Sequence, residues 1–350
     1  MEGKLEEGSK EDFLVELPEP LTRKELFCLK GPLDIPMTND YLFRALLQQN
    51  NQVLKALICA LLHLDPQSVR EVSVENPIEL GKTYEEKELI LDIKALLNGD
   101  MIINLEMQVV NEQNWKERSL YYLCRSFDHL NKGMNYSEVK PAVQIGILNF
   151  SLFEEMPEFY ANFYMINEKN YQKYSDKFRL AVVDLTQIKL ATKEDRAYKI
   201  DQWAQFFKSK DWGELVMLAQ DNIDIQAAMG TVYQLSREKQ IRQQCEARED
   251  YYKRERDRQR RDRQADEREK RADERDKQAD ERDKQADERD KQADERDKQA
   301  DERERMLEER EHQIEQNRQE LVEGQEKLEQ MKQSLAEWEK KLREKELDAM

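Results

Sequence analysis

The chain has 350 residues, of which 38% are charged, and its net charge at pH 7 is −17. It has no apolar stretch near the ~20 residues that a membrane span needs, and its acidic start, MEGKLEEGSKEDF, lacks the apolar segment of a signal peptide. Nearly all of the hydrophobic sequence lies before residue 250, whereas residues 251–350 hold 28 Lys and Arg and 34 Asp and Glu. This division predicts a disordered acidic leader (residues 1–24), one globular domain (25–250) and a long polar tail (251–350).

The cysteines and histidines give no sign of a zinc or redox site. No two of the four cysteines stand at the spacing of a metal or redox motif, and the three histidines are far apart in the sequence. Reduced thiols are typical of a cytosolic protein, so we expect a cytoplasmic location. The chain also lacks the glycine-rich patterns GxGxxG and GxxxxGK[ST], so no nucleotide cofactor is expected.

The pattern of apolar residues predicts the secondary structure in chain order. Helical spacing indicates helices over residues 38–64, with Thr38 or Asn39 as the N-cap and a break at Asn50. Two apolar runs then flank the turn sequence LNGD at 97–100, which indicates a β-hairpin. Farther along we expect a helix at 114–133, strands at 142–150 and 178–185, and helices at 197–209 and 213–236. This order predicts a mixed α/β domain.

The two runs of the hairpin can be aligned by their side-chain pattern. Alternate residues of a strand face opposite sides of a sheet, and in both runs the odd-numbered positions are apolar. Because both apolar faces must cover the same core, odd residues must pair with odd residues. A three-residue loop at 98–100 meets this requirement and pairs Leu97 with Met101.

This register brings two carboxylates together. It places Asp92 opposite Glu106, and Lys94 opposite Asn104. Directly opposed side chains have Cβ atoms about 4.5–5.5 Å apart, where like charges destabilise a sheet. A divalent cation such as Mg²⁺ or Mn²⁺, which prefers oxygen ligands, would relieve the repulsion. The pattern is also compatible with neutralisation of the pair by Lys94, or with a polar hairpin face that is simply solvated.

An Asp on one strand followed by Glu106-Met107-Gln108 on the next resembles the pattern of the PD-(D/E)XK nuclease superfamily. More closely, the chain resembles the Rpn or PD-(D/E)XK nuclease family transposase group. The segments that carry this resemblance are TNDYLFRALL (38–47), ILDIKA (90–95), INLEMQ (103–108), RSLYYLCRSFDHLNKGMNYSEVKPAVQIGILNF (118–150), FRLAVVDL (178–185), WAQFF (203–207) and EARED (246–250). The resemblance covers about residues 36–250. It implies an α/β fold with a restriction-endonuclease-like core, a mixed sheet flanked by helices, followed by a long C-terminal helix or coiled coil.

The resemblance also implies an activity, that of a metal-dependent DNA endonuclease linked to recombination or mobile elements. Asp92 and Glu106 would bind Mg²⁺ or Mn²⁺, with the backbone carbonyl of Met107 as a further ligand. The metal would lower the pKa of a bound water and neutralise charge on the phosphate. Gln108 stands in place of the usual lysine of the superfamily. It can position a water but brings no positive charge, which Lys94 on the same face could supply.

Three more residues are additional candidates for the site. Glu88, on the same face of the hairpin, could be a further ligand. Asp40 could be another acid of the site, or an acid favoured at a helix start by the helix dipole. Arg118 could bind phosphate, or lie in solvent on its helix.

The charge of the domain bears on its partner. Nucleic-acid-binding proteins usually carry a basic surface, but residues 1–250 hold 30 Lys and Arg against 41 Asp and Glu. DNA is the partner that the resemblance implies. The alternatives are an RNase on the same fold and a catalytically silent interaction or scaffold protein.

The tail repeats a seven-residue unit. Residues 272–299 read ADERDKQ four times, and the same phase continues as Leu307, Ile314, Leu321, Leu328, Leu335 and Leu342. This heptad repeat, free of Gly and Pro until Gly324, predicts a continuous helix or coiled coil over residues 265–349, about 130 Å long at 1.5 Å per residue. The alanine part (265–305) would be a solvated spacer. The leucine part, widened by Met331 and Trp338, predicts a homo-oligomer through residues 307–345.

Overall fold

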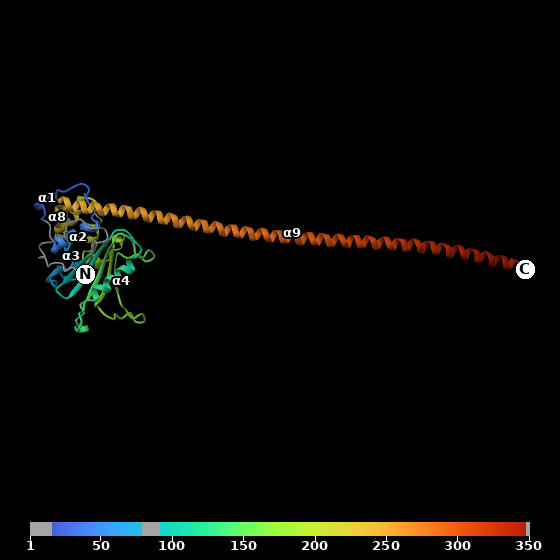
Figure 1. The fold of residues 1–350 in the computed structure, drawn as a ribbon, viewed down its shortest axis with the longest axis horizontal. Coiled ribbons are helices and arrows are strands. Elements are labelled where there is room, and N and C mark those ends of the chain that lie inside the picture. The colour runs from blue at the N-terminus through green and yellow to red at the C-terminus, as the bar shows by residue number, and fades with distance from the viewer. Residues whose placement is uncertain (1–15, 79–91, 348–350) are drawn as a thin grey trace, which may run out of the picture. The chain divides into compact units, whose positions relative to one another are not determined.

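The structure is a computed structural model that describes residues 16–78 and 92–347. The chain divides into two compact units, Met1–Arg261 and Asp262–Met350. The first unit contains a sheet and helices α1 to α8, together with the first turns of α9 (Figure 1). The second unit is the remainder of α9 (Lys239–Leu347).

A mixed six-stranded sheet forms the centre of the first unit. Its strands lie in the order β1-β2-β3-β4-β6-β5. The three strands β3, β4 and β6 are parallel to one another, and the other neighbours pair in antiparallel fashion. The bounds are β1 Val72–Val74, β2 Ile93–Leu97, β3 Met101–Gln108, β4 Ala142–Leu148, β5 Tyr160–Tyr164 and β6 Phe178–Asp184. The edge strands β1 and β5 were not predicted from the sequence, because each is short and lacks a clear alternation.

The predicted hairpin and its register are confirmed. Leu97 pairs with Met101, and Lys94 pairs with Asn104. Asn98 and Gly99 both adopt positive φ, 49° and 79°, which Asn and Gly tolerate better than other residues. The side chain of Asn98 accepts hydrogen bonds from two backbone N–H groups that precede β1, and so ties the turn to the neighbouring strand.

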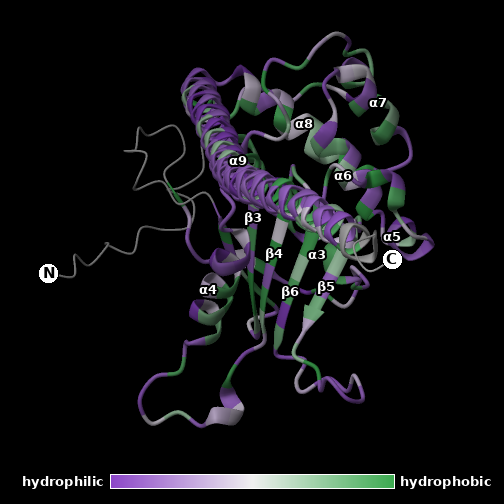
Figure 2. Ribbon diagram, turned by 90° about the vertical axis from the view of Figure 1, so that its right-hand side faces the viewer, coloured by the Kyte–Doolittle hydropathy of each residue, from purple (hydrophilic) through white to green (hydrophobic). Residues whose placement is uncertain are grey.

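Helices on one face of the sheet bury the odd-numbered side chains of the hairpin. The predicted pair of helices is present as α2 (Asp40–Gln49) and α3 (Asn51–Leu62), capped by the side chains of Asn39 and Asn50. The remaining helices of this core are α1 (Arg23–Leu26), α5 (Lys193–Ala197), α6 (Ile200–Lys208), α7 (Trp212–Gln220) and α8 (Ile223–Arg237). Short 3-10 turns lie at Tyr136–Glu138, outside this core, and at Ile188–Leu190. Figure 2 shows the apolar residues concentrated in the strands and in these helices.

Helix α4 (Trp115–Phe127) covers the other face of the sheet. Its residue Trp115 packs with Leu148 and Val182 in a small second core. The sequence predicted this helix to continue to residue 133, which is wrong by six residues. The chain turns back after Phe127, and His129 Nε2 accepts a hydrogen bond from the backbone of Lys140 (3.1 Å), which fixes the turn.

The first turns of α9 belong to the globular unit. The side chains of Ile241, Cys245 and Tyr252 are buried in it, and Asn39 Nδ2 donates to the Cys245 carbonyl (3.0 Å). The first unit, Met1–Arg261, therefore includes these turns of α9. Of the expected leader, residues 1–15 lie outside the described part, while Leu17 packs against the core.

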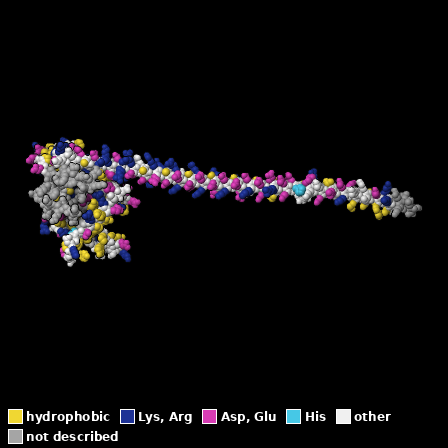
Figure 3. All heavy atoms as spheres, in the orientation of Figure 1, with side chains coloured by type: hydrophobic (Ala, Val, Ile, Leu, Met, Phe, Trp, Pro, Cys, Tyr) yellow, Lys and Arg dark blue, Asp and Glu magenta, His cyan; other side chains and the backbone are white. Residues whose placement is uncertain are grey.

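The second unit is one continuous helical segment, as the heptads predicted. Figure 3 shows acidic and basic side chains interspersed along it. Its leucine stripe is solvent-exposed in the single chain: Leu307, Ile314, Leu321, Leu328, Leu335 and Leu342 are 51–66% exposed. Within the described ranges, no helix is both long enough and apolar enough to cross a membrane.

Candidate active site

Four polar side chains of the sheet are buried beneath α4. Asn104, Glu106 and Gln108 occupy alternate positions of β3, and Gln144 lies beside them on β4. Asn104 Nδ2 donates to Gln144 Oε1 (2.8 Å). We call these four residues the polar row. The simple alternative of a solvated hairpin face is wrong here, because α4 shields this part of the face from water.

Gly146 lets α4 approach the polar row closely. It is the cross-strand partner of Glu106 on β4, and the ring of Trp115 lies directly over it. A Cβ atom at position 146 would stand 2.1 Å from a ring carbon of Trp115, which no real packing allows. The absence of a side chain at this position therefore places the first turn of α4 against the sheet, next to Glu106.

The Glu106 carboxylate is the most perturbed acid of the site. It is 5% exposed, and its Oε1 lies 2.7 Å from the guanidinium of Arg118 on α4. Its Oε2 is buried without a hydrogen-bond partner. Burial raises the pKa of Glu106 to about 7; Arg118 opposes this shift, and the charge of Asp92 adds to it. Desolvation thus outweighs the ion pair.

Asp92 lies one residue before β2, half-buried. The β2–β3 register, continued by one residue, places it opposite Glu106, and its charge acts on Glu106 and on Tyr122 of α4. Its backbone is fixed from the other side, since the carbonyl accepts hydrogen bonds from Asn76 Nδ2 (3.1 Å) and from Arg44. Asp92, Glu106, Arg118 and Tyr122 therefore form one electrostatically coupled group.

Gln108 ends β3, and its side chain points to the same face as Glu106. It is buried, and neither atom of its amide group has a hydrogen-bond partner. An amide in this state is unfavourable by about 1–3 kcal/mol, so a ligand or a bound water is expected to satisfy it. Met107 turns its side chain into the core, and only its backbone carbonyl is left for a ligand.

The remaining candidates have different surroundings. Lys94 is half-buried on β2 and makes no ion pair with any residue that the structure describes. Asp40, at the start of α2, is buried, and both of its oxygens accept hydrogen bonds from Arg248 (3.1 and 2.6 Å). Its carboxylate is therefore engaged by Arg248, although its charge still acts on Glu106. Glu88 falls in residues 79–91, outside the described part.

The donor set fits a hard divalent cation. Mg²⁺ in proteins takes one or two carboxylates and keeps several waters, and Asp92, Glu106 and the Met107 carbonyl offer such oxygens. The unpartnered Oε2 of Glu106 and amide of Gln108 show unused ligand and hydrogen-bonding capacity at the same place. Within residues 16–78 and 92–347, no three His, Cys, Asp or Glu side chains gather into a metal-binding group, so waters or substrate oxygens would have to complete the shell.

Sequence reasoning missed several residues of the site. Tyr122 was assigned no role, and it is half-buried, with the Arg118 guanidinium 5.5 Å from its ring centre. Trp115 was assigned no role. Arg248 and its hydrogen-bond partner Tyr252 lie in and beside the EARED segment. That segment supported the family resemblance, but no local pattern connects it to Asp40, 208 residues earlier.

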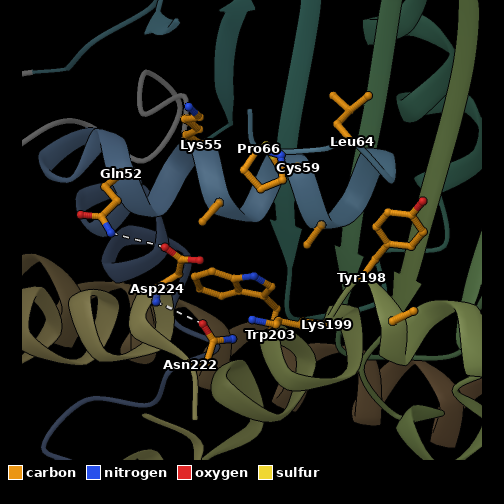
Figure 4. Close-up of a pocket in the computed structure, with 13 residues that line it drawn as sticks. Gln52, Lys55, Cys59, Leu64, Pro66, Tyr198, Lys199, Trp203, Asn222 and Asp224 are labelled. Carbon is orange, nitrogen blue, oxygen red and sulfur yellow. Dashed lines mark hydrogen bonds between the residues drawn. The ribbon is translucent and has the colours of Figure 1, made fainter. Parts of the chain in front are cut away.

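A separate hollow of about 400 Å³ lies between α3, α6 and α8 (Figure 4). Lys55 and Cys59 of α3 line it, with Trp203 of α6 and Asp224 of α8. Gln52 Nε2 donates to Asp224 Oδ1 (3.3 Å) across its edge. None of the residues predicted for the active site lines this hollow.

The raised pKa of Glu106 predicts a pH-dependent stability. In metal-free buffer, an unfolded chain loses this proton near the ordinary pKa of 4.5, whereas the folded chain keeps it up to about 7. The free energy of unfolding of the parent should therefore fall relative to Glu106→Gln as pH rises from 4.5 to 7, by up to roughly 3 kcal/mol. Urea unfolding at intervals of pH, in EDTA, measures this difference. Glu117→Gln, at an exposed position of α4, is the control, and a parent whose profile runs parallel to that of Glu106→Gln would contradict the assignment.

Comparisons with known proteins agree with this geometry. A sequence model of the family described as PD-(D/E)XK nuclease family transposase matches residues 37–265. Comparisons with curated proteins and with solved structures returned no match. The family match spans well over half of the chain and contains the whole polar row, the hairpin and α4. The chain belongs to the PD-(D/E)XK nuclease family transposase family.

Proposed function

We propose that the protein is a divalent-metal-dependent endonuclease that hydrolyses phosphodiester bonds of DNA, in recombination or the movement of mobile elements. Family membership supports a nuclease-like activity. The observation that carries the proposal is the state of β3, where a carboxylate oxygen of Glu106 and the amide of Gln108 are buried without partners beside Asp92. Such groups are unfavourable in a resting structure and are typical of a site that holds a ligand.

Asp92, Glu106 and the Met107 carbonyl would hold Mg²⁺ or Mn²⁺. A bound metal of this kind lowers the pKa of its water and offsets negative charge on the scissile phosphate. Asp92 and Glu106 would be deprotonated when they hold it, so uptake of the metal should release a proton from Glu106 near neutral pH.

The remaining residues would orient the reactants. Gln108 is neutral, and its amide can accept from a water and donate to a phosphate oxygen at the end of β3. The positive charge that it lacks would come from Arg118 and Lys94. Arg118 balances Glu106 in the structure (2.7 Å). Once a cation takes over that balance, its guanidinium is available for a phosphate, which it can bind in a bidentate manner.

The acidic balance of the domain limits how DNA is held. A surface with more carboxylates than cations gives little non-specific attraction for a phosphate backbone. We therefore expect weak binding that depends on local contacts near the site. The same acidity is what a silent scaffold protein would show, and cleavage assays separate the two.

Removal of the acids should abolish cleavage. Asp92→Ala and Glu106→Ala should each lose at least 100-fold in the rate of plasmid nicking, because each removes a charged ligand of the metal. Gln108→Ala should lose less, since a neutral amide orients rather than ligates. The assay follows supercoiled plasmid and a structured RNA with Mg²⁺, with Mn²⁺ and with EDTA.

The matched control for these variants is Glu117→Ala, which removes an exposed acid of α4 and should cut like the parent. Circular dichroism checks that each variant is folded. Cleavage by Asp92→Ala or Glu106→Ala at the parent rate would overturn the site. Cleavage of the RNA but not of the plasmid would replace DNA by RNA as substrate.

Metal binding should also be visible without catalysis. A ligand that binds only the folded state raises the melting temperature by mass action. Mg²⁺ or Mn²⁺ should therefore raise the melting temperature of the parent, and much less that of Asp92→Ala. Differential scanning fluorimetry over a metal titration measures this. Equal shifts in the two proteins would place the ion elsewhere.

The second part of the proposal is that the chain forms homo-oligomers through the apolar stripe of its tail. Six Leu and Ile side chains form one stripe along α9, and each is more than half exposed in the single chain. Full burial of such a side chain is favourable by roughly 1.5–3 kcal/mol. Pairing with a second chain would bury this stripe, so we infer a homodimer or higher oligomer through residues 307–345. Met331 and Trp338, three residues after Leu328 and Leu335, would widen the interface.

Charged substitutions in the stripe should therefore dissociate the protein. Light scattering at tens of micromolar should give the mass of a dimer or larger species for the parent and a monomer for Leu328→Lys/Leu335→Lys. The control, Gln330→Lys/Gln333→Lys, adds the same charge outside the stripe and should remain assembled. A monomeric parent would refute the inference and leave the tail as a solvated spacer.

A further inference from the structure

The single helix α4 is too narrow to cover its whole face of the sheet. A helix with its side chains is about 10–12 Å wide, and neighbouring strands lie about 4.8 Å apart, so one helix shields little more than two strands. The polar row lies at the β3 side of α4. On the β6–β5 side there is a groove of about 320 Å³. Its lining includes Trp115 and Lys116 of α4, Phe153, the β5 residues Phe163 and Tyr164, and Phe178 of β6.

Aromatic and aliphatic side chains make up most of the lining of this groove, which we call the aromatic groove. Five of its lining residues are aromatic, one is a lysine, and none is acidic, in a chain whose net charge is −17. The ammonium of Lys116 lies 4.7 Å from the ring centre of Phe153, and that of Lys173 lies 3.9 Å from the ring centre of Tyr164. Phe153 and Phe163 are 41% and 40% exposed. Apolar rings are thus presented to solvent beside positive charge.

The aromatic groove and the candidate active site are adjacent. Trp115 lines the groove and also lies over Gly146, the partner of Glu106 in the sheet. Two strand spacings separate β3 from β6, a distance on the order of 10 Å. Helix α4, about 10–12 Å wide with its side chains, lies between the two sites. A strand whose phosphate lies at Glu106 would therefore pass over α4 and reach the groove with a base several nucleotides away.

We propose that the aromatic groove binds an unpaired base of a DNA single strand whose backbone passes the Asp92–Glu106 site; this rests on the proposed nuclease function and specifies its substrate. Stacking on aromatic rings is how proteins hold unpaired bases, and nearby cations contact the phosphates. A base inside a duplex cannot present its face in this way. The volume of 320 Å³ is at the lower end of small-molecule pockets, a size suited to one base.

Binding measured in EDTA tests this proposal without cleavage. The probes are three fluorescein-labelled oligonucleotides: a 20-nucleotide thymidine strand, a blunt duplex of the same length, and a strand of the same length with abasic sites in place of its bases. Fluorescence anisotropy with the full chain should show the tightest binding to the thymidine strand. Phe153→Ala and Phe163→Ala should each weaken that binding about tenfold, the effect expected for one stacked base. Their binding to the duplex and to the abasic strand should be unchanged.

Two controls separate stacking from folding. Phe163→Tyr keeps the ring and should bind like the parent. Tyr136→Ala removes an aromatic ring that is 88% exposed and outside the groove, and should also bind like the parent. Melting temperatures establish that every variant is folded.

Equal affinity of the parent for the thymidine and abasic strands would overturn the proposal. So would binding of the thymidine strand by Phe153→Ala and Phe163→Ala with the affinity of the parent. A change in oligomer mass by light scattering with unchanged binding would assign the groove to a second copy of the chain and would also overturn it. If Phe163→Ala cleaves plasmid and Glu106→Ala does not, the nuclease site is supported even where the binding data refute the groove proposal. Absence of cleavage by the parent would refute the proposed nuclease function, while tighter binding of the thymidine strand would still support a groove that binds unpaired bases.

Discussion

The burial of one carboxylate determines the arrangement of the site. Glu106 is held away from water in the middle of β3 with one strong contact, to Arg118, and with one oxygen unsatisfied. A buried charge with so few partners is costly, and its pKa rises to about 7 as a result. Arg118 can reach it only because α4 lies close to the sheet, and α4 lies close because Gly146 has no side chain beneath Trp115. The ion pair of Glu106 with Arg118 therefore depends on the contact between Trp115 and Gly146.

The width of α4 explains why the same face of the sheet carries two different groups of side chains. The helix covers the centre of the face, so the side chains at its two flanks are reached from different directions. On one flank are acids and an amide suited to a metal and a phosphate. On the other are aromatic rings suited to a flat apolar ligand. A substrate strand that crosses α4 would meet both flanks in succession.

Sequence reasoning predicted the hairpin well and its surroundings poorly. Side-chain parity and the Asn98-Gly99 turn determine the register, because only a loop with an odd number of residues keeps both apolar faces on the same side, and the turn sequence favours three. The burial of the polar row by α4 could not be predicted. A strand with one polar face has the same alternation of polar and apolar residues whether that face contacts water or a buried polar cluster. The pairing of Asp40 with Arg248 has no local signal either, because the contact joins residues 208 apart. For the same reason the short edge strands β1 and β5 escaped prediction: tertiary pairing, not local pattern, makes them strands.

The Asp40–Arg248 pair has a consequence for biosynthesis. Asn39 and Asp40, at the start of α2, have hydrogen-bond partners on α9. The ribosome adds these partners about 210 residues later. At 5–20 residues per second, translation of this interval takes on the order of 10–40 s. During that time α2, α3 and the hairpin can associate, but Asp40 has no arginine to neutralise it. The nascent domain therefore reaches its final packing only when the first turns of α9 have left the exit tunnel, so that completion of the globular unit is delayed until synthesis of the tail has begun.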